Sequence, residues 1–216
     1  MTRPPAQATP GARPATPALS LTADDVRTDD ADAELARVVS QAADGSERAW
    51  TELIRLYGRR VFGLVRARCR NAEVAKEITQ TVFAKVAVEL RAGRYDETGK
   101  FEAWLFRIAV NKARDEIRKQ KRRARLGLVG GDAVDSVADG GTSDAPDRED
   151  MDMLRTAIDR LGEADREIVH LRHHGQMSFQ QIAELLDAPV GTLLARHHRA
   201  LKKLRGIIEQ LAEGSS

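Results

Sequence analysis

The sequence predicts an all-α protein made of two small helical domains that a flexible acidic linker joins. Apolar residues recur at steps of three and four over two long stretches of the chain. Aromatic residues are scarce, at 4%, while charged residues reach 31%, a balance that is more typical of helical proteins than of β-sandwiches. A segment rich in Gly and Asp, residues 127–150, separates the two periodic stretches and contains few large apolar residues.

The charges divide the 216-residue chain into blocks of opposite sign. Residues 35–125 hold 22 basic and 11 acidic residues, whereas residues 126–151 hold one basic and seven acidic residues. An acidic segment with so few apolar residues cannot bury enough surface to offset the entropy of ordering its backbone. We therefore expect a disordered Pro- and Ala-rich tail at 1–30, a first domain at 31–125, a linker at 126–150 and a second domain at 151–212.

Several classes of protein are disfavoured. No apolar run approaches the roughly 20 residues that span a bilayer, and the N-terminus lacks the apolar core of a secretory signal. Cys69 is the single cysteine, so neither a disulfide framework nor a cysteine metal site is expected. We find no nucleophile–base constellation and no phosphate loop. The expectation is a cytoplasmic protein that is not an enzyme, with no membrane insertion and no cofactor.

Four helices are expected in the first domain. A short apolar stripe from Leu35 stops at Asp44-Gly45, and Ser46 can then cap a helix that carries Trp50 to Val65. Asn71 is the predicted N-cap of the third helix, which Gly93 ends. After the loop GRYDETGK, a long helix is expected from Phe101 to about Arg123, with Trp104, Leu105, Ile108 and Ile117 on its apolar side.

The long helix also carries a polar face. Arg107, Asn111, Asp115, Arg118 and Arg122 recur at steps of 4, 4, 3 and 4, and Arg114 adjoins them. Residues 107–125 hold nine basic and two acidic residues. Such a face suits a nucleic acid, because cations neutralise phosphates and an amide can contact a base. A solvated helix face, with basic residues that suit the helix dipole, is the alternative.

The second domain contains a predicted helix-turn-helix. Ser178 and Gln181 have the spacing of a capping box, and Asp187-Ala188-Pro189 breaks the chain before a basic helix that starts near Val190. Leu193, His197, Ala200 and Leu204 should point inward. A neighbouring stripe should point outward and fit a DNA major groove: Thr192, Arg196, Arg199 and Lys203. The adjacent pairs His173-His174 and His197-His198 point to different helix faces, so no metal site is expected.

Both domains resemble the bacterial RNA polymerase sigma factors of the extracytoplasmic-function type, group 4 of the sigma-70 family. In the first domain the matching stretches are DGSERAW, EITQTVF, FEAWLFRIAVNKARDEIR and KQKRR. In the second they are LGEADREIVHLR, SFQQIAELLDAPVGT and RHHRALKKL. The resemblance covers roughly residues 35–125 and 152–210, and it implies a subunit that confers promoter specificity on the core polymerase.

The resemblance also implies how the surfaces divide this task. Glu77, Gln80 and Thr81 match the region that docks on the β′ clamp helices, and a contact with the β flap is expected for the second domain. Asn111 matches the asparagine of the pocket that captures a −10 base, with Arg107, Arg114, Asp115, Arg118 and Arg122 beside it. The helix from Val190 matches the −35 reader. Promoter DNA and an anti-sigma factor are the further implied partners.

Four positions depart from the family pattern. Members usually have an acid at Thr81, a basic residue at Leu194, a small hydroxyl residue at Ala195 and an aliphatic residue at His197. The departures at Thr81, Leu194 and Ala195 keep one alternative open, a sigma-like interaction protein that binds polymerase or a regulator and reads DNA weakly. A helix-turn-helix repressor that binds DNA without polymerase is a second alternative.

Overall fold

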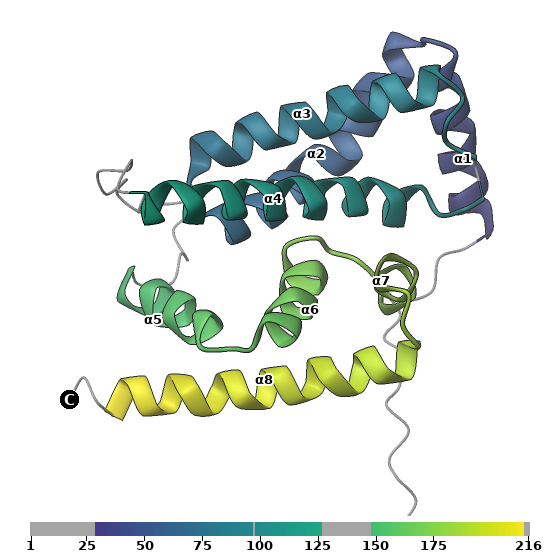
Figure 1. The fold of residues 1–216 in the computed structure, drawn as a ribbon. Coiled ribbons are helices and arrows are strands. Elements are labelled where there is room, and N and C mark those ends of the chain that lie inside the picture. Colours follow the sequence, from purple (N-terminus) through teal and green to yellow (C-terminus); the bar gives the residue numbers. More distant parts are fainter. Residues whose placement is uncertain (1–28, 97, 127–147, 214–216) are drawn as a thin grey trace, which may run out of the picture.

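The computed structural model describes residues 29–96, 98–126 and 148–213, and within these ranges it contains eight helices and no strand (Figure 1). The all-α fold of two helical units is therefore confirmed. The predicted tail at 1–30 lies outside the described residues except for Asp29 and Asp30, which begin the first helix. Most of the predicted linker also lies outside them, and its last three residues, 148–150, belong to a helix.

The N-terminal unit consists of α1 (Asp29–Ala43), α2 (Glu47–Cys69), α3 (Ala72–Arg91) and α4 (Phe101–Arg125). The predicted caps are confirmed. The Ser46 hydroxyl accepts a hydrogen bond from the backbone N–H of Ala49, and the Asn71 side chain accepts one from Val74. Each cap satisfies one of the N–H groups that the first turn of a helix leaves unpaired. Gly93, with φ +63°, follows the end of α3 in a conformation that favours glycine.

The C-terminal unit consists of α5 (Arg148–Asp159), α6 (Glu163–His173), α7 (Phe179–Leu186) and α8 (Val190–Glu213). Ser178 and Gln181 form the predicted capping box at the start of α7. Asp187 ends α7 in the left-handed region, with φ +52°, and Pro189 precedes the new helix. Figure 1 shows α8 as the outermost helix, with α5, α6 and α7 between it and the N-terminal unit.

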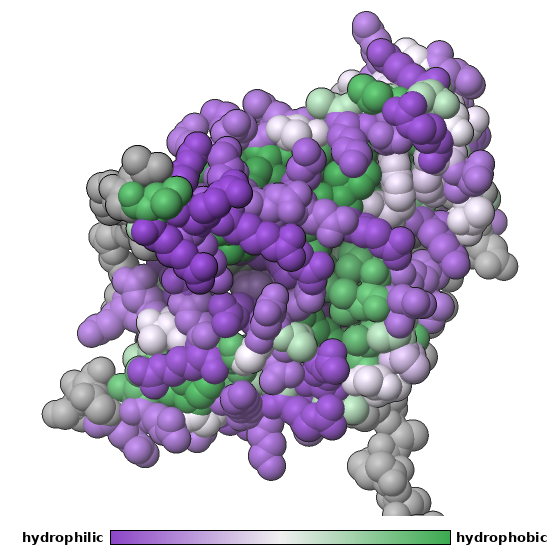
Figure 2. Space-filling model, viewed as in Figure 1, coloured by the Kyte–Doolittle hydropathy of each residue, from purple (hydrophilic) through white to green (hydrophobic). Residues whose placement is uncertain are grey.

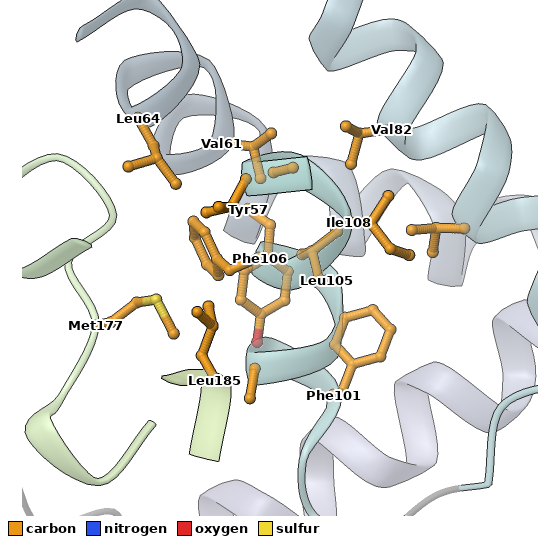
Figure 3. Close-up of a cluster of buried hydrophobic side chains, with 14 of the residues drawn as sticks. Tyr57, Val61, Leu64, Val82, Phe101, Leu105, Phe106, Ile108, Met177 and Leu185 are labelled. Carbon is orange, nitrogen blue, oxygen red and sulfur yellow. The ribbon is translucent and has the colours of Figure 1, made fainter. Parts of the chain in front are cut away.

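The two units share one apolar core, which the sequence did not predict. Met177 and Leu185 of the C-terminal unit pack beside Tyr57, Leu64 and Phe106 of the N-terminal unit (Figure 3). Met177 and Phe106 are completely buried. The sequence made no prediction of how the two units contact each other; in this conformation α6 contacts α2, and α7 contacts α4. A second, smaller core joins α5, α6 and α8.

Candidate nucleic-acid interface

The outer side of α4 presents a continuous polar face to solvent. We call it the α4 face, and its residues are Arg107, Asn111, Asp115, Arg118 and Arg122, all of them exposed. They share one side because the opposite side of α4 buries Leu105, Ala109 and Ala113 in the core. Figure 2 shows hydrophilic side chains gathered over the C-terminal half of α4. The predicted grouping of these five residues is confirmed, while their role stays a prediction.

An open cavity of about 550 Å³ adjoins the α4 face. Asn111 lines it together with Lys85 of α3 and the half-buried ring of Trp104. The Tyr95 ring packs against the Trp104 ring with a centroid distance of 4.6 Å and an interplanar angle of 34°, so the loop between α3 and α4 helps to orient the Trp104 ring. The cavity thus combines an aromatic wall, an amide and cations, which are the groups that hold a nucleic-acid base and its phosphates. Its remaining lining residues are Arg107, Ile108, Lys112, Arg114, Asp115 and Arg118.

Two arginines of the predicted set are held by the C-terminal unit. Arg107 donates from Nη2 to the backbone carbonyls of Glu184 at 2.8 Å and Leu185 at 3.3 Å, near the end of α7. Arg114 donates from Nη2 to both carboxylate oxygens of Glu167 on α6, at 2.7 and 2.9 Å. Neither contact follows from the spacing within α4, because both partners lie in the other unit.

The second predicted DNA surface runs along α8. We call Thr192, Arg196, Arg199 and Lys203 the α8 stripe. All are exposed except Arg196, which is half-buried, and Arg199 and Lys203 form no ion pair with any described residue. Beneath the stripe, Leu193, Ala200 and Leu204 are buried as predicted.

His197 departs from the predicted inward set, because it is only half-buried. Its Nε2 lies 3.2 Å from Nε2 of His173 on α6, and its ring meets the Phe179 ring edge-on. Burial, with help from the neighbouring His173 and Arg172, lowers the pKa of His197 to about 4. Burial, followed by the charge of Arg172, also lowers the pKa of His173. Both imidazoles are therefore neutral near pH 7 and can share a single N–H···N hydrogen bond that links α6 to α8.

Three predicted polymerase-binding residues share the exposed side of α3. Glu77, Gln80 and Thr81 are all exposed, and the Thr81 hydroxyl donates to the backbone carbonyl of Glu77 at 2.9 Å. A second cavity of about 500 Å³, between α3 and α4, is lined by Glu77 and Thr81 together with Lys112. Glu77 and Thr81 therefore line the same cavity, whereas Gln80 is not among its lining residues.

Sequence reasoning missed several residues around this interface. Lys85 lines the Asn111 cavity but lies on α3, so no spacing within α4 could reveal it. Arg68 and Glu167 were missed as an ion pair between the units. The sequence did contain an indication that Arg68 is shielded from solvent, because this residue lies among the apolar residues Leu64, Val65 and Cys69 at the end of α2.

Neither a metal cluster nor a membrane span is found in the described part of the chain. Between residues 29 and 213, outside the gaps at 97 and 127–147, no group of three or more His, Cys, Asp and Glu side chains is placed to hold a metal ion. Over the same ranges no helix is long and apolar enough to cross a membrane.

Comparisons with known proteins point to one family. Residues 53–123 match the family model for sigma-70 region 2, and residues 151–204 match that for sigma-70 region 4. The chain is 32% identical to the RNA polymerase sigma factor CarQ of Myxococcus xanthus, over 78% of this chain and 94% of CarQ. It is 28% identical to the ECF RNA polymerase sigma factor SigW of Bacillus subtilis, over 80% of this chain and 96% of SigW.

Solved structures share the fold. CnrH, in complex with the cytosolic domain of CnrY, superposes with a TM-score of 0.60 at 24% identity, over 81% of this chain and 97% of CnrH. The sigma factor RpoE of Bartonella quintana, in complex with the anti-sigma factor NepR, gives a TM-score of 0.59 at 17% identity, over 74% of this chain and 96% of RpoE.

Proposed function

Because the chain belongs to the sigma-70 family of RNA polymerase sigma factors, in the extracytoplasmic-function group, and acts with RNA polymerase in promoter-specific transcription initiation, we propose how its surfaces divide that task. The α4 face captures the single strand of the −10 element, and the α8 stripe binds the −35 duplex. The exposed side of α3 docks on the polymerase. The chain supplies no catalytic chemistry of its own, since the polymerase makes the RNA.

The observation that carries the −10 assignment is the cavity beside Asn111. A base that leaves the duplex loses its stacking and pairing, so a pocket that stacks and hydrogen-bonds the base favours the melted state. Trp104 supplies an aromatic surface and Asn111 an amide with both donor and acceptor atoms. Arg118 and Arg122, exposed along the same face, are placed to hold the phosphates that follow the flipped base.

The −35 assignment is supported by the position of α8 in a helix-turn-helix. The second helix of this motif enters the major groove, where arginine can bind guanine through two hydrogen bonds and lysine can bind phosphate. Arg199 and Lys203 are exposed and unpaired among the described residues, so they need not break an internal contact to bind DNA. Leu194 is half-buried against the core, which leaves base reading to Thr192, Arg196 and Arg199.

Polymerase docking involves Glu77, Gln80 and Thr81 on α3, which we assign to the β′ clamp helices, with the β flap as the contact of the C-terminal unit. The two solved neighbours are complexes with the CnrY cytosolic domain and with the anti-sigma factor NepR. By analogy we propose an anti-sigma partner for this chain. The protein would then work in the cytoplasm, where bacterial polymerase acts.

The test begins with core RNA polymerase, the purified chain and fragmented genomic DNA. Sequencing the transcripts that depend on the added chain identifies its promoters. On one of these, Asn111→Ala should lower the rate of open-complex formation, measured by the reactivity of unpaired thymines, more than it lowers binding of the closed complex. Removal of a hydrogen-bonding group from the base pocket weakens only the state in which a base occupies it.

Gln210→Ala is the matched control, since it removes an exposed amide from α8 outside both DNA surfaces. It should leave both steps unchanged. Open complexes that form at the wild-type rate with Asn111→Ala would refute the −10 assignment. Transcription that does not depend on the added chain would refute the division of tasks as a whole and favour the interaction protein.

A further inference from the structure

All five histidines of the chain lie in the C-terminal unit, within or directly after α6 and within α8. Spacing along a single helix places the members of each adjacent pair on different sides, which is why the sequence predicts no metal site. Packing of α6 against α8 instead joins one member of each pair, because the Nε2 atoms of His173 and His197 are 3.2 Å apart. Metal binding here therefore depends on contact between two helices and not on spacing within one.

The distances between these two rings fit a single metal ion. A tetrahedral zinc ion binds imidazole nitrogens at about 2.0 to 2.1 Å, which places the two nitrogens about 3.3 Å apart and the two ring centres about 5.2 Å apart. The corresponding distances between His173 and His197 are 3.2 Å and 5.3 Å. The metal-free pair is therefore already close to the separation that an ion requires, and only a small movement of the two side chains is needed.

The protonation state of the pair also suits a metal ion. Burial, followed by the charge of Arg172, lowers the pKa of His173, and burial is the main reason that the pKa of His197 falls to about 4. Both rings are therefore neutral near pH 7, so no proton has to be removed before a metal binds. In the metal-free pair one ring carries its hydrogen on Nε2, and transfer of that hydrogen to Nδ1 of the same ring frees both Nε2 lone pairs.

We propose that His173 and His197 form a two-histidine site for an exchangeable divalent transition-metal ion, of the class that favours imidazole ligands, such as zinc, copper and nickel. Among the described residues no group of three or more His, Cys, Asp and Glu side chains is placed to hold a metal ion, so water completes the coordination of the bound ion. Structural zinc sites have four protein ligands, whereas a site with open positions releases and exchanges its ion more readily.

The charged neighbour of the pair limits its affinity. The Arg172 guanidinium donates to the backbone carbonyl of Met177 at 2.9 Å and lies over the Phe179 ring, 5.2 Å from its centroid. Its charge lowers the pKa of both histidines, and it opposes the approach of a dication for the same electrostatic reason. We therefore expect weaker binding than in a structural zinc site.

An ion at this position links α6 to the helix that carries the α8 stripe. His173 is the last residue of α6, and His197 directly follows Arg196 of the stripe. The ring of Phe179, the first residue of α7, meets the His197 ring edge-on, so three helices of the C-terminal unit converge on the pair. The bound ion should therefore oppose local opening between α6 and α8.

The test uses the full chain without an affinity tag, freed of metal by a chelator, with zinc chloride as the probe in isothermal titration calorimetry. We expect saturable binding of about one zinc ion per chain. His173→Gln and His197→Gln should each weaken binding about tenfold or more, because a single imidazole cannot chelate the ion. The double variant should bind no more weakly than either single variant, since chelation requires both rings at once.

Controls separate this site from adventitious binding. His198→Gln changes the adjacent exposed histidine on α8 and should keep the wild-type affinity for zinc. Magnesium chloride should give no binding, because magnesium prefers oxygen ligands. Burial raises the pKa of the Cys69 thiol to about 11, so this thiol stays protonated and does not compete for zinc in the folded chain.

Hydrogen exchange gives an independent readout. At ten times its dissociation constant, zinc should slow the exchange of backbone amides near His197 by about tenfold in the wild-type chain, because the ion must leave before the helices open. His173→Gln should show no such slowing.

A wild-type chain without saturable zinc binding would overturn the proposal. It would also be overturned if His173→Gln bound zinc as tightly as wild type, or if His198→Gln lost as much affinity as His173→Gln. His173→Gln replaces an exposed side chain, and it decides the matter if circular dichroism shows that His197→Gln does not fold. None of these results bears on the DNA assignments, because the site depends only on the contact between α6 and α8.

Discussion

Arg60 of α2 and Glu102 of α4 form a shielded ion pair at 3.0 Å, with side chains that are 17% and 5% exposed. The same guanidinium donates to the backbone carbonyls of Gly175 and Gln176 in the C-terminal unit. It also lies over the rings of Tyr57 and Phe106, 5.2 Å from each centroid. One side chain therefore links two helices of the N-terminal unit to the chain segment that leads into α7.

Removal of the carboxylate should destabilise the fold. Glu102→Ala leaves the Arg60 charge in a largely buried site, and loss of one partner of a buried pair costs about 3 to 5 kcal/mol. We expect the free energy of unfolding to fall by about 3 kcal/mol in urea titrations followed by circular dichroism. Asp152→Ala, which breaks the exposed pair of Asp152 and Arg155, is the control and should change the midpoint little. Equal effects of the two variants would contradict the structural role of Arg60.

The capping box of α7 should matter for the helix-turn-helix. Ser178→Ala removes the acceptor for the Gln181 backbone N–H at 3.1 Å. We expect a loss of about 1 kcal/mol, and a smaller loss for Ser178→Gly, because glycine tolerates the N-cap conformation better than alanine. Thermal unfolding of both variants measures the difference. If Ser178→Ala has the same midpoint temperature of unfolding as wild type, the hydrogen bond makes no net contribution to the stability of the fold.

The sequence predicted the helices well because their signals are local. Ser46 and Asn71 mark helix starts through hydrogen bonds to residues three positions away, and such contacts can be read directly from spacing. The α4 face was predictable for the same reason, since its members differ by three or four positions on one regular helix. The inward positions Leu193, Ala200 and Leu204 also follow from periodicity.

The contact between the two units could not be predicted, since it joins residues that the chain separates widely. Arg68 and Glu167 lie 99 positions apart, and Arg107 meets Glu184 at a separation of 77. The apolar residues at this contact, Met177 and Leu185, fit the core of a separate C-terminal unit equally well in sequence. For that reason the periodic pattern predicts which side of a helix is buried but not which unit buries it.

Acid should weaken the fold through His170 of α6, which is 5% exposed. Burial, and then the charges of His174, Arg68, Arg166 and Arg70, lowers the pKa of His170 from 6.5 to about 3. A histidine with a lowered pKa stays neutral in the folded chain while the unfolded chain takes up a proton. Stability is therefore unaffected above pH 6.5 and falls as the pH drops from there toward 3, by at most about 1.4 kcal/mol per pH unit.

Urea titrations between pH 7.5 and 4.5, roughly the span over which the unfolded histidine gains its proton, measure this slope. His170→Leu cannot take up a proton, so its free energy of unfolding should decline less steeply with acid than that of wild type. His198→Leu changes an exposed histidine of α8 and should keep the wild-type slope. Parallel curves for wild type and His170→Leu would mean that His170 is not the group responsible.

If the α8 stripe binds duplex DNA, the affinity for the duplex should fall with increasing salt concentration in a way that depends on the residues of the stripe. Each cation that neutralises a phosphate releases counterions, so loss of one phosphate contact reduces the slope of log K against log salt by about one. Lys203→Ala should therefore weaken binding of the polymerase holoenzyme to its promoter uniformly across sequences and flatten the slope by this amount. Arg199→Ala should in addition relax the preference for one base of the −35 element, because arginine reads guanine by two hydrogen bonds.

Arg205→Ala removes an exposed charge that lies off the stripe on the same helix, and it should leave the slope close to that of wild type. A larger effect of Arg205 than of Lys203 would place the duplex on a different side of α8.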